Sequence, residues 1–216
     1  MPARLTSEFI QQAVSETAWD FGNRVLYDLC AANPGHARDD IIIAKVWLIG
    51  RSYAAAIERR PIADGAIGDA FYETVVAPKI RCSDIDNWFR ELGTCSNTDV
   101  GLILEMHTRV MRLFNEISGL EKRSLASKYL HFHFPERFYI YDGRANDAIK
   151  KLTKRPGKNL PPLRGYDNEY ARFFVRCQNL NEQMASLVGR HLLPREFDKV
   201  LLAYRRSSSM IHESSS

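Results

Sequence analysis

The chain has 216 residues, of which 45% are hydrophobic and 26% are charged, a composition ordinary for a soluble globular protein. It has no run of about eighteen apolar residues, and its N-terminal MPARLTSEF lacks a hydrophobic signal core. We therefore expect no general disorder, no membrane partner and no export, with the cytoplasm or the nucleoid as the default location.

The cysteines are widely spaced and form no CxxC pair. They are Cys30, Cys82, Cys95 and Cys177. This spacing is typical of reduced thiols in a cytosolic protein, and it indicates neither a disulfide framework nor a zinc site. We expect no metal and no cofactor.

The net charge of +4 is unevenly distributed. Residues 121–158 carry ten Lys or Arg against four Asp or Glu, a local charge of +6, so the remaining residues sum to −2. Such a segment favours an anionic partner, most often a polyphosphate backbone. A solvated basic face without a partner fits the charge alone equally well.

Helical periodicity dominates the first half of the chain, and strand-like alternation is nearly absent. In chain order, the predicted helices cover residues 6–32, 39–60, 64–78, 83–92 and 98–117. The Asn-Pro-Gly at 33–35, Pro61 and Pro78 end three of them, while Ser83 and Asn97 are good N-caps.

The second half continues the helical pattern. A helix starts at Ser118 or Ser124 and ends near His133, because Pro135 disfavours helical backbone at the residue before it. The remaining predicted elements are helices at 143–152, 167–188 and 194–206, a basic Pro/Gly-rich loop at 153–165 and a polar tail at 207–216.

These patterns predict an all-α fold of about nine helices. Residues 1–206 form one domain, which is long enough for a single large core or for two lobes sharing a cleft, and 207–216 form a mobile tail. No internal repeat is visible, which disfavours a solenoid.

One lysine lies inside an apolar run of the stretch SLASKYLHFHFP. Lys128 shares a helical stripe with Leu125 and Phe132 and is flanked by Tyr129 and His131. Desolvation among such neighbours is one way to raise the free-amine fraction that a lysine nucleophile needs. The alternative is a stem that packs on apolar surface while the ammonium meets water or phosphate.

One aspartate follows the Tyr-Ile-Tyr of residues 139–141. Asp142 precedes Gly-Arg-Ala-Asn and is a natural N-cap for the helix at 143–152. A carboxylate in that place can also stabilise a developing positive charge or accept a proton from an attacking amine. The sequence allows both roles.

The order of a long helix, a turn, SLASK, a short helix and IYDGRA resembles the helix-hairpin-helix DNA glycosylases, especially the branch similar to 8-oxoguanine glycosylase. In the family pattern Gly-x-Gly-Ser/Thr-Lys, Ser124 and Ala126 stand at the two glycines, Ser127 at the Ser/Thr and Lys128 at the catalytic lysine. Asp142 stands at the catalytic aspartate. The resemblance implies an all-helical fold of two lobes around a cleft.

The resemblance also implies an activity and a partner. The protein would be a DNA glycosylase with abasic-site lyase activity, Lys128 would be the nucleophile, and Asp142 would stabilise the charged sugar. The partner would be double-stranded DNA with a damaged or modified base, which must leave the stack. DNA repair and anti-phage defence are both compatible with this chemistry, and we expect a monomer.

Candidate residues for the base pocket and for DNA binding follow from that reading. The pocket candidates are Trp47, Arg51, Tyr53, His131, Phe132, Tyr139 and Tyr141. The DNA-binding candidates are Lys122, Arg123, Ser124, Ser127, Arg144, Lys150, Lys151, Lys154 and Arg155. Aromatic residues at helical spacing are more often core, and Arg51 is also placed for an ion pair with Glu58.

Two further function classes stay open. One is a non-catalytic helical module that binds nucleic acid through residues 121–158, and the other is a helical interaction protein in which Lys128 and Asp142 merely pair or cap.

His131 and His133 do not form a metal site, because side chains two apart on a helix point in different directions. No P-loop, GxSxG, HExxH or Rossmann motif occurs.

Overall fold

A computed structural model describes residues 5–59, 68–95, 99–153 and 165–213. The chain divides into two compact units. Ala18–Phe138 form the continuous unit, and Met1–Thr17 with Tyr139–Ser216 form the discontinuous unit. In the described ranges no helix combines the length and the apolar character that a membrane span requires.

The predicted all-α class is confirmed. Every regular element in the described part of the chain is helical, and no strand occurs there. The described helices number ten when α4, η2 and α5 are counted as one and the three-residue η1 is left out, close to the predicted nine. The glycosylase-like arrangement of two lobes around a cleft stays a prediction.

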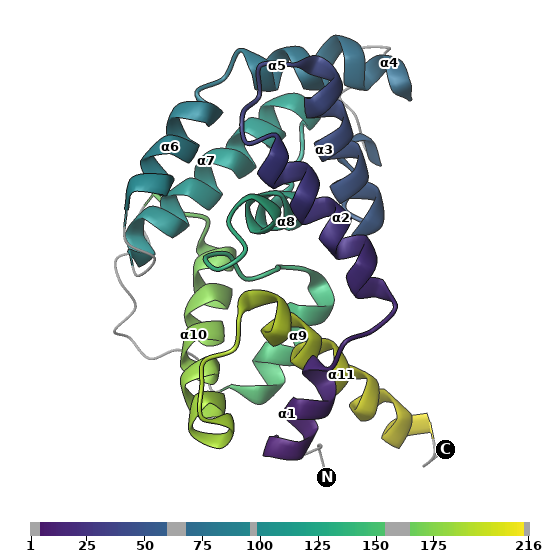
Figure 1. Cartoon of the computed structure of the whole chain (residues 1–216), viewed down its shortest axis with the longest axis vertical. Helices are drawn as coiled ribbons and strands as arrows, with labels where there is room; N and C mark the ends of the chain where they lie inside the picture. The colour runs from purple at the N-terminus through teal and green to yellow at the C-terminus, as the bar shows by residue number, and fades with distance from the viewer. Residues whose placement is uncertain (1–4, 60–67, 96–98, 154–164, 214–216) are drawn as a thin grey trace. The chain divides into compact units, whose positions relative to one another are not determined.

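The continuous unit is built around a central helix. Its elements are α2 (Trp19–Ala32), α3 (Asp39–Ser52), η1 (Ile57–Arg59), α4 (Asp69–Phe71), η2 (Tyr72–Val76), α5 (Ala77–Arg81), α6 (Ile85–Thr94), α7 (Val100–Ser118) and α8 (Arg123–His133). Helix α8 packs against α2, α3 and α7, as Figure 1 shows. Every side chain from Leu125 to Phe132 is buried, as expected for a helix surrounded by others.

The discontinuous unit joins the first helix to the last three. It contains α1 (Ser7–Val14), α9 (Gly143–Leu152), α10 (Asn168–Val188) and α11 (Pro194–Glu213). Helix α9 packs on α10 and α11, and α1 packs on α10 and α11. Its core includes Ile10, Ile149, Phe173, Phe174 and Phe197, each at most 2% exposed.

The single helix predicted over residues 6–32 is wrong, because it is two helices. Ser15 ends α1: its hydroxyl donates to the Gln12 carbonyl at 2.7 Å, and its backbone N–H donates to the same oxygen at 3.3 Å. Serine competes in this way for backbone groups that would otherwise continue a helix. The break separates α1 from α2, and the boundary between the two units falls in it.

The long helix predicted to reach Arg60 is also wrong, because α3 ends at Ser52. Ala54 has φ +52°, a left-handed backbone that an L residue seldom adopts, and the Ala55 N–H donates to the Gly50 carbonyl at 2.7 Å. The chain therefore turns back against its own helix. A Cβ on Gly50 would lie 3.1 Å from the Ala56 Cα, so glycine permits this close approach.

Pro78 does not end a helix, contrary to prediction. Residues Asp69 to Arg81 form one helical stretch whose middle, Tyr72–Val76, is a π turn directly before α5. A π turn departs from the hydrogen-bond pattern of the α-helix, so a proline without an N–H is accommodated behind it. The predicted start at residues 64–65 lies outside the described residues.

The connection between α7 and α8 shows that neither of the two predicted N-caps starts α8, because its N-cap is Lys122 and no side chain caps it. Ser118 is the last residue of α7, and its hydroxyl donates to the Phe114 carbonyl at 2.7 Å, so it caps nothing that follows. Gly119 ends α7 with φ +72°, and α8 begins at Arg123, one residue before Ser124. Lys128 consequently lies in the second turn of α8.

Helix ends with purely local signals agree with prediction. Helix α8 stops at His133 before Pro135, and Asp142 and Asp167 cap α9 and α10. The cap of α7 is Asp99, whose side chain accepts from the Leu102 N–H at 3.0 Å; the predicted cap, Asn97, is not among the described residues.

The predicted end of the last helix at Arg206 is wrong, since α11 runs to Glu213. Part of the segment predicted as a mobile tail is therefore helical. Serine is only moderately unfavourable inside a helix, so Ser207 can continue one that is already formed. Its hydroxyl donates to the Ala203 carbonyl at 3.2 Å.

Candidate active site

Lys128 is a fully buried lysine on the central helix of the continuous unit. Its side chain is 1% exposed, and Nζ donates a hydrogen bond of 2.6 Å to the Ser124 hydroxyl, one turn earlier on α8. Nζ also lies 5.8 Å from the centroid of the Tyr53 ring, which is within range of a cation–π interaction. Of the two alternatives that the sequence left open, the structure shows the buried side chain, and the role of Lys128 as a nucleophile stays a prediction.

Tyr53 is held in place from two sides. Its hydroxyl donates to Asn23 Oδ1 on α2 at 2.7 Å, and its ring meets Phe132 edge-on at 5.4 Å between centroids. The left-handed turn at Ala54 follows directly, so the irregular end of α3 puts this ring beside Lys128.

His131 links α8 to α2 through a defined tautomer. Its Nδ1 lies 2.9 Å from the Phe138 carbonyl oxygen, which can only accept, so Nδ1 carries the proton. In the neutral ring Nε2 then accepts from the Tyr27 hydroxyl at 2.6 Å. Tyr27 also packs on Phe132 at 4.8 Å between ring centroids.

Seven side chains from α2, α8 and the end of α3 thus meet in one unit, and we refer to them as the lysine cluster. They are Asn23, Tyr27, Tyr53, Ser124, Lys128, His131 and Phe132. Tyr27, Tyr53 and Ser124 are themselves partly exposed, so Lys128 lies beneath side chains that reach solvent. An amine, aromatic rings and hydroxyl groups together suit a nucleophile beside a flat, polar substrate.

Asn23 and Tyr27 were not among the predicted site residues. They are spaced four apart on α2, which puts them on one helix face, and that spacing was the only available signal. The hydroxyl and amide groups of α2 meet α8 and the end of α3 through tertiary packing alone, which the sequence pattern does not contain.

Asp142 is the N-cap of α9 in the discontinuous unit. Its carboxylate accepts a hydrogen bond from the Ala145 N–H at 2.7 Å, which is the capping role that the sequence allowed. Its negative charge faces the positive end of the helix dipole, which stabilises it. Lys128 and Asp142 belong to different units, so their action on one substrate stays a prediction.

Tyr139 and Tyr141 are side chains of the core of the discontinuous unit. Tyr139 packs on Phe174 and Phe197, and its hydroxyl accepts from Asn181 at 3.2 Å; burial raises its pKa to about 12. Tyr141 is 7% exposed and packs on Phe173. The structure thus accounts for both as core aromatics, and their pocket role stays a prediction.

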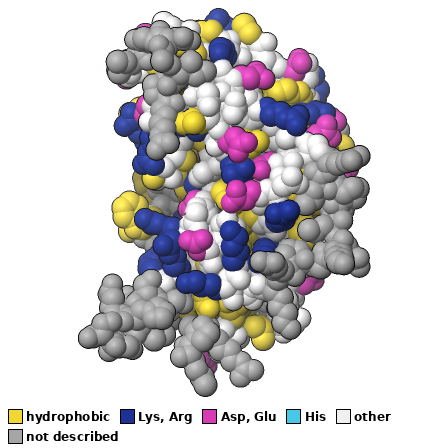
Figure 2. Space-filling view, turned by 180° about the vertical axis from the view of Figure 1, so that it is seen from behind, with side chains coloured by type: hydrophobic (Ala, Val, Ile, Leu, Met, Phe, Trp, Pro, Cys, Tyr) yellow, Lys and Arg dark blue, Asp and Glu magenta, His cyan; other side chains and the backbone are white. Residues whose placement is uncertain are grey.

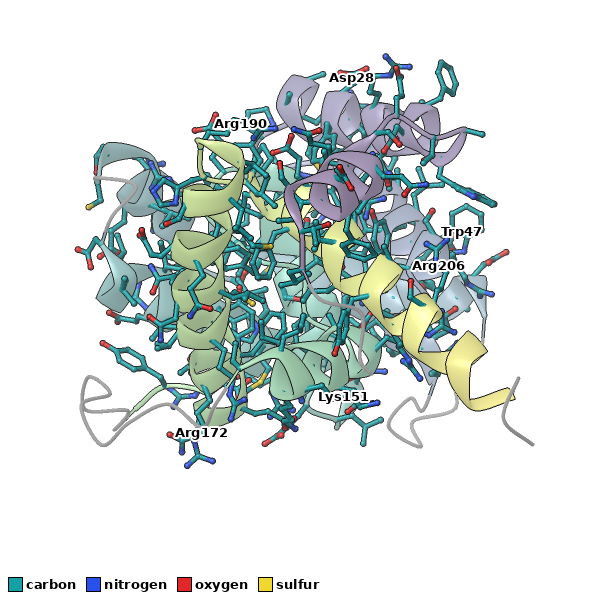
Figure 3. All side chains as sticks on the ribbon, turned by 90° about the horizontal axis from the view of Figure 1, so that it is seen from below. Asp28, Trp47, Lys151, Arg172, Arg190 and Arg206 are labelled. Carbon is teal, nitrogen blue, oxygen red and sulfur yellow. The ribbon has the colours of Figure 1, made fainter. Side chains whose placement is uncertain are left out.

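Trp47 and Arg51 lie on the outer part of α3. Trp47 is 41% exposed (Figure 3). Arg51 forms the ion pair with Glu58 that the sequence suggested as an alternative, although Glu58 lies in η1 and not on the same helix. Tyr72 donates to the same carboxylate, and burial, followed by this hydrogen bond, raises the Tyr72 pKa.

The stretch that stands at the Gly-x-Gly-Ser/Thr positions of the family pattern is helical, and the DNA-binding role of Ser124 and Ser127 stays a prediction. Ser124 and Ala126 are residues of α8. The Ser127 hydroxyl donates to the Ser124 carbonyl at 3.0 Å. Ser124 and Ala126 are small residues but not glycines, so neither favours a backbone conformation that would interrupt the helix.

The predicted basic residues divide into two groups. Lys122 donates to the Ala56 carbonyl at 3.2 Å and Arg123 pairs with Glu121 at 3.1 Å, so both have contacts within the continuous unit. Arg144, Lys150 and Lys151 on α9 are exposed. Lys154 and Arg155 lie outside the described residues.

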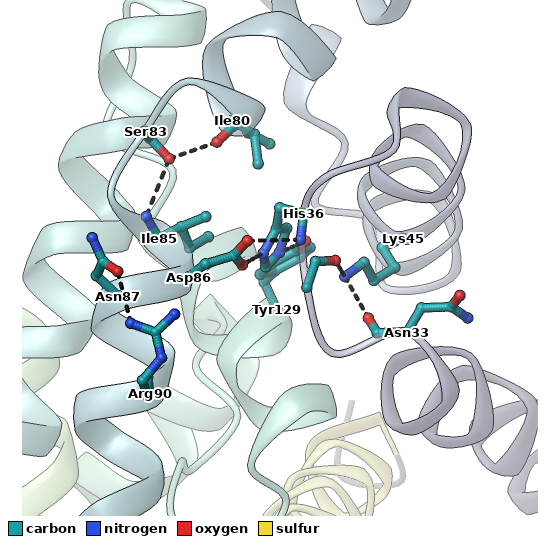
Figure 4. Close-up of polar contacts among 11 residues, drawn as sticks. Asn33, His36, Lys45, Ile80, Ser83, Ile85, Asp86, Asn87, Arg90 and Tyr129 are labelled. Carbon is teal, nitrogen blue, oxygen red and sulfur yellow. Dashed lines mark hydrogen bonds and ion pairs between the residues drawn. The ribbon is translucent and has the colours of Figure 1, made fainter.

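A second polar cluster fixes the opposite side of α8 (Figure 4). The His36 ring contacts Asp86 Oδ1 through Nδ1 at 2.6 Å and the Tyr129 hydroxyl through Nε2 at 2.7 Å. Burial, followed by the charge of Lys45, lowers the pKa of His36 to about 4. At neutral pH the ring is therefore uncharged: Nδ1–H donates to Asp86, and Nε2 accepts from Tyr129.

Lys45 is the other fully buried lysine of this unit. Its Nζ donates to the carbonyls of Asn33 and Gly35 at 2.8 and 3.0 Å, and burial lowers its pKa to about 8. These carbonyls belong to the turn that ends α2, so Lys45 satisfies groups that the helix end leaves without helical partners. We assign this lysine a structural role.

His133 lies against His36 and Tyr129, and burial lowers its pKa well below the ordinary value. Its neighbour His131 contacts a different set of residues, as expected for side chains two apart on a helix. In the described part of the chain no group of three or more His, Cys, Asp or Glu could hold a metal ion.

Comparison with protein-family models, with curated proteins and with solved structures found no match for this chain.

Proposed function

We propose that the protein is a DNA glycosylase with associated abasic-site lyase activity, in which Lys128 is the nucleophile and the Asp142 carboxylate assists. The observation that carries the proposal is the burial of Lys128 beside the Tyr53 ring and the Ser124 hydroxyl. A lysine that acts as a nucleophile must be neutral when it attacks, and desolvation favours the neutral amine.

The proposed reaction breaks an N-glycosidic bond. As the base leaves with the bonding electron pair and takes up a proton, positive charge develops on the sugar, and the Asp142 carboxylate stabilises it. The neutral Lys128 amine attacks C1′, loses a proton and forms a Schiff base as the sugar ring opens. Loss of a C2′ proton then expels the 3′ phosphate and cleaves the strand.

The lysine cluster offers the groups that an extruded base requires. Partly exposed aromatic rings can stack on a base, and the amide of Asn23 and the hydroxyls of Tyr27 and Tyr53 can hydrogen-bond to its edge. Double-stranded DNA with a modified base is therefore the proposed substrate. Such a substrate would bring the protein to the nucleoid.

Borohydride trapping tests the nucleophile. The protein is incubated with duplexes that carry an abasic site or one of a panel of modified bases, and a Schiff base is reduced to a stable protein–DNA adduct. We expect an adduct with the wild type and none with Lys128→Gln, and peptide mapping should place it on Lys128. An adduct on Lys45, the other buried lysine of the unit, would contradict the proposal.

Asp142→Asn tests the carboxylate with little risk to the fold. Asparagine caps helices as well as aspartate does, so α9 should keep its N-cap while the charge is lost. We expect base release to fall by about a hundredfold or more, in line with the loss of one preorganised electrostatic group. Normal base release from this variant would remove Asp142 from the mechanism.

A non-catalytic nucleic-acid-binding module is the second candidate function. The exposed cations of α9, which are Arg144, Lys150 and Lys151, favour it. The hydrogen bond and the ring contact of Lys128 also explain that residue as a core side chain without catalysis. Salt-dependent binding to DNA without base release or adduct on any substrate would favour this second function.

A further inference from the structure

Several exposed cations of the discontinuous unit have no carboxylate at ion-pair distance among the described residues. They are Arg144, Lys150 and Lys151 on α9, and Arg172 on α10. Other arginines of the same unit are paired: Arg190 lies 2.7 Å from Glu196, and Arg195 lies 2.7 Å from Asp198. Among the described residues, the four cations Arg144, Lys150, Lys151 and Arg172 therefore differ from these paired arginines.

The two helices bring these cations together. Arg176 on α10 donates to the Thr153 hydroxyl at the end of α9 at 3.1 Å, which fixes the two helices to each other at this point. Arg172 lies one turn earlier on the same face of α10. In Figure 3 the labelled Lys151 and Arg172 both project from the lower edge of this view. We refer to Arg144, Lys150, Lys151, Arg172 and Arg176 as the α9–α10 basic face.

Few acids oppose this face. Asp147 is exposed on α9, and Glu169 lies in the first turn of α10, where its carboxylate accepts from Tyr141 at 2.5 Å and from Asn146 at 3.2 Å. The N-caps Asp142 and Asp167 lie at the first ends of the same two helices, where each accepts a hydrogen bond from a backbone N–H. Asp147 is thus the exposed carboxylate within α9, beside the exposed Arg144, Lys150 and Lys151. On the face of the molecule that Figure 2 shows, several Lys and Arg side chains lie next to Asp or Glu side chains.

Helix electrostatics explain only part of the arrangement. Lys150 and Lys151 occupy the last turn of α9, where cations stabilise the negative end of the dipole. Arg172 is in the second turn of α10, towards the positive end, so it gains nothing from the dipole. Its exposed, unpaired charge needs another reason.

A regularly spaced polyanion fits the face better than a small anion does. Arg144 and Lys151 are separated by seven residues of helix, or about 10 Å. That length of duplex carries about six phosphates. Exposed side chains without a buried donor are poorly suited to enclosing one small anion but can follow a backbone.

We propose that the α9–α10 basic face binds the phosphate backbone of nucleic acid, without sequence preference. The inference deepens the proposed function, because it rests on DNA as the partner and adds Arg172 and Arg176 to the residues that contact it. It does not require base release.

The salt dependence of DNA binding tests the face. Fluorescence anisotropy with a labelled duplex gives the slope of log Kobs against log salt concentration for the full-length wild type and for a Lys151→Gln, Arg172→Gln double variant. Each lost phosphate contact should reduce the slope by about 0.9, so the double variant should lose about two. If the wild type and the double variant bind DNA equally at about 1 M salt, this difference in slope implies that the double variant binds about thirtyfold more weakly at about 0.15 M salt.

An Arg190→Gln, Arg206→Gln double variant is the matched control. It removes the same charge from exposed positions of the same unit, and Arg206 lies away from Lys151 and Arg172 in Figure 3. We expect a slope close to that of the wild type. Equal slope changes in both double variants, no change in either, or no DNA binding by the wild type would each overturn the proposal.

Two further measurements keep the outcomes distinct. Thermal unfolding followed by circular dichroism should show both double variants folded, because all four side chains are exposed. Borohydride trapping is carried out with the wild type in parallel. A reduced slope together with no adduct would retain the α9–α10 basic face and contradict the glycosylase.

Discussion

The buried histidine His36 makes stability depend on pH in a defined window. Its pKa falls from an ordinary 6.5 to about 4, chiefly through burial. Between these values the unfolded chain binds a proton at His36 that the folded chain does not. The free energy of unfolding therefore falls as the pH is lowered from 6.5 towards 4, and the stabilisation is fully present above 6.5.

The magnitude follows from that pKa. A change from 6.5 to about 4 corresponds to about 3 kcal/mol, and the ring is 1% exposed, so solvent screening is small. His133 acts in the same direction, because burial lowers its pKa as well. The pKa of Asp86 is also lowered, from its ordinary 3.8. Its effect on stability therefore begins below pH 3.8, outside the pH range in which His36 acts.

Urea unfolding between pH 7 and pH 4.5, followed by circular dichroism, measures this dependence. His36→Gln retains one donor and one acceptor but cannot titrate, so its stability curve should be lower at pH 7 and flatter below pH 6.5. His191→Gln is the control, because His191 is exposed and outside the cluster. An equally steep curve for His36→Gln would refute the assignment of this proton to His36.

The other predictions concern single contacts. Tyr53→Phe removes the hydroxyl that donates to Asn23 and loosens the ring beside Lys128, so adduct formation should slow by about tenfold while the melting temperature changes little; an unchanged rate would contradict a role for Tyr53. The Asn181 amide donates to the Leu192 carbonyl and accepts from the Leu192 N–H, so Asn181→Ala leaves both buried groups without this partner. Urea unfolding should show that the free energy of unfolding falls by about 3 kcal/mol, and a fall below about 1 kcal/mol would contradict a stabilising role for these two hydrogen bonds. Gly50→Val should also destabilise, by about 1–3 kcal/mol, because its Cβ would meet the backbone at Ala56; unchanged stability would mean that the chain can move aside.

Local signals account for the parts of the fold that were predicted correctly. Asp142 and Asp167 cap helices because a side-chain oxygen two or three residues before a free N–H needs only local geometry. Pro135 ends α8 for an equally local steric reason. The apolar stripe of Lys128 left both burial and a solvent-reaching ammonium open, and the tertiary packing of α8 decides for burial.

Tertiary contacts account for the parts that the sequence could not predict. The left-handed backbone at Ala54 is unusual for alanine, and it depends on the close approach of Gly50 to Ala56. The spacing of residues in the sequence does not predict this approach. The contacts of Asn23 and Tyr27 join residues thirty and more positions apart. The sequence also could not tell that Tyr139 and Tyr141 pack in the core of the discontinuous unit, because core and pocket share the same residue types.

The central claim is that Lys128 is the nucleophile of a DNA glycosylase, and trapping with matched variants tests it most directly. With an abasic-site duplex and borohydride, we predict a covalent adduct that maps to Lys128 and is lost in Lys128→Gln, while Lys79→Gln, at an exposed position of α5 outside the lysine cluster and the α9–α10 basic face, still forms it. An adduct that persists in a folded Lys128→Gln variant, or the absence of any adduct with the wild type, would contradict the account.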